Sequence, residues 1–152
     1  MSPATDLDQL LRRLEPATPD NRAWRLRFGL ACAERVAHLL EAPEVLDGLA
    51  RFRAALERGS DDPELDRLAE TLPGLAQRHP GSRSLDGVGH AAVSASYTCA
   101  MAVRGRARQA AEYAAYAMVY GQGGYGATSD IASFVPEHAW QLATLRELLA
   151  AS

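Results

Sequence analysis

Histidines are the side chains of this chain with the widest chemical use, and there are four of them: His38, His79, His90 and His138. A helical metal site commonly needs two histidines one turn apart, and no two of these have that spacing. Glu34 precedes His38 by four residues, so the two could form half of a metal or acid/base site. A surface ion pair is the commoner role of such a pair, and we therefore expect neither a metal nor a cofactor.

One histidine, His90, stands inside the most apolar segment of the sequence. It could act there as a catalytic base or a substrate contact, or it could be a hydrogen-bonded core histidine. The first interpretation describes a small helical enzyme or ligand-binding protein, with an alternative pocket formed by His90, Tyr97, Glu112 and the glycine run at 121–127. The second interpretation leaves the chain without a reactive group at this position.

The glycine run itself, Gly121-Gln122-Gly123-Gly124-Tyr125-Gly126, resembles an amide-lined loop that holds a phosphate. No strand precedes it, and the chain has no lysine, which Walker loops, Schiff-base enzymes and pyridoxal enzymes require. There is also no G-x-S-x-G motif and no cysteine near a histidine in sequence. We therefore assign no catalytic residue, expect a protein that is not an enzyme, and predict a flexible glycine-rich connection over 121–132.

Tyrosines recur at helical spacing just before and within this run. Tyr113, Tyr116 and Tyr120 align at i, i+3 and i+7, and Tyr125 follows. Tyrosine supplies a large contact area at little cost in rotamer entropy, which makes these four residues candidates for partner contacts. A core stripe with its hydroxyls at the rim explains the same spacing. A second candidate set lies on the polar side of an earlier helix: Arg27, Glu34 and His38.

Helical periodicity and capping signals account for the whole chain without any strand. The predicted helices cover about 5–15, 18–41, 43–59, 62–72, 85–103, 107–120 and 133–150, and Pro73 with Gly74 should break or kink the fourth. The segment 85–103 is apolar on nearly every side, which predicts a central helix. The sequence therefore predicts an all-α, single-domain bundle of about six to seven mostly antiparallel helices over 1–152, with 1–17 as a short leader helix.

Composition excludes several classes of protein. The formal net charge is -3, and the arginines are scattered rather than clustered, which argues against nucleic-acid binding. No segment is long and apolar enough for a membrane span, and the first residues lack the pattern of a signal peptide. Cys32 and Cys99 are far apart in apolar surroundings, as expected of free thiols in a reducing compartment. We expect a cytoplasmic protein.

Two segments resemble the all-helical immunity proteins of bacterial polymorphic toxin systems. The first is Leu26 to Leu40, which contains Cys32-Ala33-Glu34-Arg35-Val36, and the second is Gly89-His90-Ala91-Ala92 with the alanine- and tyrosine-rich helix that follows. The likeness covers about Arg22 to Gly59 and Val88 to Trp140. The chain departs from the pattern between Glu64 and Ser84, where Pro73-Gly74 and Pro80-Gly81 interrupt alanine-rich helix.

This resemblance implies a bacterial antidote that binds a cognate protein toxin domain and blocks its active site without catalysis of its own. It implies no catalytic residue. The helices rich in small residues are also compatible with a homo-oligomer held together by close helix contacts.

Overall fold

The computed structural model describes residues 2–14, 19–78 and 88–151, and within these ranges the chain forms helices and no strand. This confirms the predicted all-α bundle. The elements, in chain order, are α1 (Pro3–Leu14), α2 (Pro19–Arg35), the 3₁₀ turn η1 (Ala37–Leu39), α3 (Pro43–Arg58), α4 (Pro63–Gln77), α5 (Val88–Val103), α6 (Ala107–Thr128), the 3₁₀ turn η2 (Ile131–Phe134) and α7 (Val135–Ala150).

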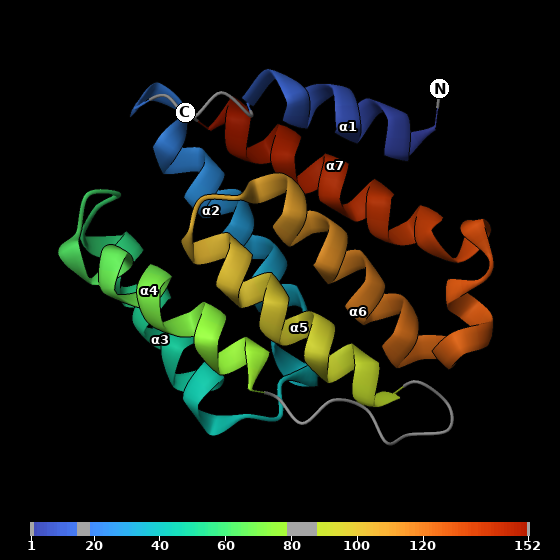
Figure 1. The fold of residues 1–152 in the computed structure, drawn as a ribbon. Helices are drawn as coiled ribbons and strands as arrows, with labels where there is room; N and C mark the ends of the chain where they lie inside the picture. The colour runs from blue at the N-terminus through green and yellow to red at the C-terminus, as the bar shows by residue number, and fades with distance from the viewer. Residues whose placement is uncertain (1, 15–18, 79–87, 152) are drawn as a thin grey trace.

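Three helices form the centre of the bundle, and two helix pairs cover it. α5 and α6 lie side by side as an antiparallel hairpin, and α2 packs behind both of them (Figure 1). The pair α3 and α4 covers one side of α5, whereas α1 and α7 pack on each other at the opposite side of the bundle (Figure 1). The prediction that the apolar segment before residue 104 is a central helix is therefore confirmed.

Small residues let the central helices approach closely. The α6 alanines at 110, 111, 114, 115 and 117 are all buried, and so are the α5 alanines at 91, 92, 95, 100 and 102. At the crossing of α2 with α5, a methyl group added to Gly29 would lie only 3.0 Å from both Cα and Cβ of Ala102. The backbones therefore meet at distances that no larger side chain would permit.

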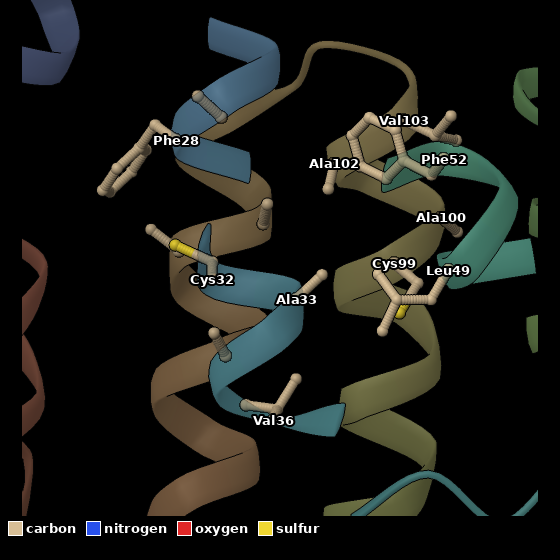
Figure 2. Close-up of a cluster of buried hydrophobic side chains, with 14 of the residues drawn as sticks. Phe28, Cys32, Ala33, Val36, Leu49, Phe52, Cys99, Ala100, Ala102 and Val103 are labelled. Atoms are coloured by element: carbon tan, nitrogen blue, oxygen red, sulfur yellow. The ribbon is translucent and has the colours of Figure 1, made fainter. Parts of the chain in front are cut away.

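Larger side chains fill the space around this crossing. Phe52 and Leu49 on α3 are buried beside the small residues of α5, whereas the buried ring of Phe28 points away from α5 on the other side of α2 (Figure 2). Cys32 and Cys99 are both buried and free, and Figure 2 shows their side chains well apart. Burial raises the pKa of both thiols, that of Cys99 to about 12, so both stay protonated at neutral pH.

Several helix ends match the capping signals. The Asp62 carboxylate accepts a hydrogen bond from the Glu64 amide at 2.9 Å and starts α4 at Pro63. Gly59 ends α3 with φ of 147°, a conformation that favours glycine. The start predicted at residue 85 for the next helix lies outside the described residues.

Three predicted boundaries were wrong. α2 ends at Arg35 rather than near Glu41, because η1 tightens the chain and lets it reverse into α3. The end predicted for the fourth helix near residue 72 was also wrong, because α4 continues through Pro73 to Gln77; the Pro73 ring removes one amide donor, but Leu72 and Ala76 on either side of it remain buried.

The third error concerns the glycine run, which is helical and not a loop. α6 extends through Gly121 to Thr128, and the one break within it is Gly124, with φ 63° and ψ -150°. Glycine adopts this conformation at little cost, whereas other residues rarely do. The flexible connection predicted for 121–132 is thus replaced by helix, a single break and η2.

Adding one methyl group at the α2–α5 crossing should destabilise the protein. For Gly29→Ala we expect a loss of about 1–2 kcal/mol in the free energy of unfolding, because overpacking against Ala102 outweighs the better helix propensity of alanine. The control is Gly126→Ala, where nothing lies within 4 Å of the added methyl group; it should stabilise α6 slightly. Urea denaturation of both variants measures the difference, and equal effects would contradict the close approach.

Both thiols should resist modification in the folded protein. Thiol reagents attack the thiolate, and burial keeps Cys32 and Cys99 protonated and covered. With a chromogenic disulfide reagent at neutral pH, we expect almost no reaction in buffer and reaction of both cysteines in denaturing urea. Rapid labelling of either thiol in the native protein would show that the core opens readily.

Candidate functional site

Aromatic side chains from α5 and α6 meet at one end of the α5–α6 hairpin. The His90 ring on α5 lies 5.4 Å from the Tyr120 ring and 5.3 Å from the Tyr125 ring, centroid to centroid. Tyr120 and Tyr125 also contact each other edge to face, at 6.0 Å and 90°. His90 is therefore held among rings of α6, an arrangement typical of favourable aromatic packing.

The ring contacts continue from α6 to the beginning of α7. Tyr116 lies 6.2 Å from Tyr120 and 5.0 Å from Phe134 of η2, and Phe134 stacks on His138 at 6.0 Å. We call these six residues the aromatic face: His90, Tyr116, Tyr120, Tyr125, Phe134 and His138. A separate stacked pair, Tyr97 and Tyr113 at 5.3 Å, joins α5 to α6 nearer the middle of the hairpin.

Local backbone geometry explains how the face is assembled. Tyr113, Tyr116 and Tyr120 share one side of α6 because residues three and four apart are neighbours on a helix. Tyr125 joins them because α6 breaks at Gly124, immediately before it. The η2 turn then places Phe134 about one helical turn before His138. The Asp130 carboxylate caps η2 by accepting a hydrogen bond from the Ala132 amide at 3.1 Å.

The aromatic face is partly exposed and lies mostly in a stretch of sequence with few charges. Tyr116 is 47% exposed and Tyr125 43%, and Ile131 and Val135 nearby in sequence are 87% and 47% exposed. Between Tyr113 and Glu137 the sequence contains a single charged residue, Asp130. Exposed apolar groups with few charges are typical of the centre of protein–protein interfaces.

An ion pair next to the face attaches α7 to α2. Arg35 donates two hydrogen bonds to the Glu137 carboxylate, both at 2.8 Å, and its guanidinium lies 4.3 Å from the centre of the Trp140 ring. Glu137 is almost fully buried, and its hydrogen bond raises the pKa of Arg35. This bidentate ion pair orients the first turn of α7, from which His138 contacts Phe134 of the aromatic face.

The residues predicted to contact a partner separate into two groups. Tyr116, Tyr120 and Tyr125 belong to the aromatic face, and Tyr113 precedes them in α6 and stacks on Tyr97. Arg27 and Glu34 instead line an open groove of about 400 Å³ between α2 and α3, where Glu34 pairs with Arg53 at 3.0 Å. His38 is exposed in η1.

The alternative pocket around His90 is only partly assembled. His90 contacts Tyr120 and Tyr125, while Tyr97 lies two turns along α5 and stacks on Tyr113. Glu112 does not join them: it lines a cavity of about 130 Å³ together with His138 and Gln141. Within the described residues, no group of three or more histidine, cysteine or acidic side chains could hold a metal ion.

Sequence analysis missed Phe134, His138 and the Arg35–Glu137 pair as parts of this region. Phe134 and His138 are four residues apart, a spacing that could have suggested their contact. The Arg35–Glu137 pair joins residues 102 positions apart, and nothing local indicates it.

The chain matches no family model, no curated protein and no solved structure. None of the helices among the described residues is long and apolar enough to cross a membrane. The immunity-protein resemblance and the cytoplasmic location stay predictions.

The charge of His138 should affect folding stability in mildly acidic solution. Burial lowers the pKa of His138, and the negative charge of Glu137 opposes this only in part. The unfolded chain therefore binds this proton more readily, so the His138 contribution is fully present above about pH 6.5 and is lost as the pH falls through the lower folded-state pKa.

We expect the NMR titration of the His138 ring to give a pKa below that of a free histidine. The melting temperature should fall more between about pH 7 and pH 5 for the native chain than for His138→Gln. Equal slopes for the two proteins would show that the ring is not desolvated.

Proposed function

We propose that this protein acts by binding another protein through the aromatic face, as an immunity protein that neutralises a bacterial toxin domain. The observation that carries the proposal is an exposed cluster of tyrosines in a stretch of sequence with one charge between Tyr113 and Glu137. Monomeric proteins rarely expose such apolar groups together without a use for them.

The ring contacts favour binding because they fix the side chains in advance. Tyr116 touches both Tyr120 and Phe134, and Tyr125 touches both His90 and Tyr120. A side chain that is already ordered loses less entropy when a partner covers it. Tyrosines held in this way are the residues that most often contribute strongly to binding.

The toxin assignment rests on the resemblance of two segments to immunity proteins. One of them, Gly89-His90-Ala91-Ala92 with the helix that follows, supplies both His90 and the tyrosines of the aromatic face. An inhibitor needs a rigid surface and no reactive group of its own, and the sequence offers no nucleophile or base in a catalytic arrangement.

If the proposal holds, the gene next to that of this protein encodes a toxin, and binding to the purified domain of that toxin is the direct test. We expect tight binding by the native chain, and a weakening of about 30-fold for Tyr116→Ala, the effect of losing one strongly contributing tyrosine. Ile131→Asp should weaken binding further by placing a charge on the apolar surface. Calorimetry with the purified domain gives these values.

Leu46→Asp is the matched control for Ile131→Asp. Leu46 is 43% exposed but lies on α3, away from the aromatic face. It should leave affinity unchanged. Binding by all three variants at the native strength would locate the contact elsewhere, and a native chain that neither binds nor protects against this toxin would refute the assignment.

A further inference from the structure

An arginine-lined cavity lies at the other end of the α5–α6 hairpin. It occupies about 300 Å³ between the end of α1, the side of α2 and the turn that joins α5 to α6. In Figure 1 this turn lies beside α2, far from η2 and the aromatic face. Among the described residues, the lining of the cavity includes four arginines and no acidic residue: Leu11, Leu14, Arg25, Arg104, Gly105, Arg106, Ala107, Arg108 and Gln109.

Only one of the four arginines has an acidic partner among the described residues. Arg108 pairs with Asp8, with 2.6 Å between Nη2 and Oδ1. Arg25 donates from Nη1 to the Gly105 carbonyl at 3.0 Å and forms no ion pair with a described residue. Arg104 and Arg106 are exposed and form no ion pair within the part of the chain that the structure describes. The cavity thus concentrates positive charge in a protein whose formal charge is -3.

Arg25 also has an unused donor. Its Nε is buried and has no hydrogen-bond partner in the described structure, and a buried donor without a partner is costly. Burial, with Arg22 nearby, lowers the pKa of Arg25. An anion in the cavity would supply a compensating charge next to the Arg25 guanidinium.

The beginning of α6 adds to the positive potential. Its N-cap residue is Arg106, no side chain caps the helix, and its first turn holds no acidic residue. The amino end of a helix carries a partial positive charge that favours anions. Arginine forks match the paired oxygens of a phosphate, and a cavity of this size also leaves room for a small organic group beside Leu11 and Leu14.

We propose that this cavity binds the phosphate group of a small phosphorylated molecule. Arg25 and Arg104 hold the phosphate oxygens, the start of α6 faces the same charge, and the leucines contact the organic group. The cavity is separate from the aromatic face, so the phosphate proposal can be tested independently of the toxin proposal.

Calorimetric titration of the full chain at fixed ionic strength tests the site, with glycerol 2-phosphate and inorganic phosphate as the two probes and glycerol as the uncharged control. We expect saturable binding of at least one phosphate probe and none of glycerol. Tighter binding of the ester identifies a phosphorylated molecule as the ligand, and binding of inorganic phosphate alone identifies the free ion. Absence of saturation with both at tens of millimolar overturns the proposal.

Arginine variants distinguish specific binding in the cavity from a general electrostatic attraction of anions to the protein. Arg104→Gln should weaken binding about tenfold, the effect of losing one charge-assisted hydrogen bond, and its exposed position makes the fold indifferent to the change. Arg25→Met should do at least as much. Arg27→Gln removes the same charge from an exposed position on the same helix and is the control. Equal weakening by Arg27→Gln and Arg104→Gln would overturn the proposal.

Discussion

Close contact between α2, α5 and α6 is the constraint on which the rest of the structure depends. At the Gly29–Ala102 crossing and along the alanines of α5 and α6, the helices approach until no space for a larger side chain is left. Such contact excludes water, so every buried polar group needs a partner within the protein. Ser96 and Thr98 bond to carbonyl groups one turn back in α5, and Gln141 donates to the Ala111 carbonyl at 2.8 Å.

Because these helices pack without space between them, the candidate binding residues lie at the two ends and on the outside of the α5–α6 hairpin. The rings that gather at one end and the arginines at the other are both attached to the same rigid pair of helices. The Arg35–Glu137 pair then fixes α7 against α2 and so completes the aromatic end. A binding surface built on a rigid core retains its shape without a partner, which favours tight association.

The sequence predicted the fold well because helix periods and caps are local. Asp62-Pro63 and Gly59 act through neighbouring residues, and they marked the helix ends correctly. The composition of the glycine run led to the wrong prediction of a flexible connection, because glycine is compatible with a helix that tertiary contacts hold in place. Gly121 provides one such contact: a methyl group added to it would lie 3.1 Å from the Leu39 side chain. The tyrosine spacing predicted three of the rings, but their contacts with His90 and Phe134 come from segments distant in the sequence.

The single break in α6 gives its last turn a degree of independence. At Gly124 the helical hydrogen-bond ladder is interrupted, so the residues that follow can open without unwinding the alanine-rich part of the helix. Amide hydrogens of that turn would then exchange with solvent sooner than those before it. Because Tyr125 belongs to this unit, its ring contacts with His90 and Tyr120 also hold the last turn of α6 against the rest of the hairpin.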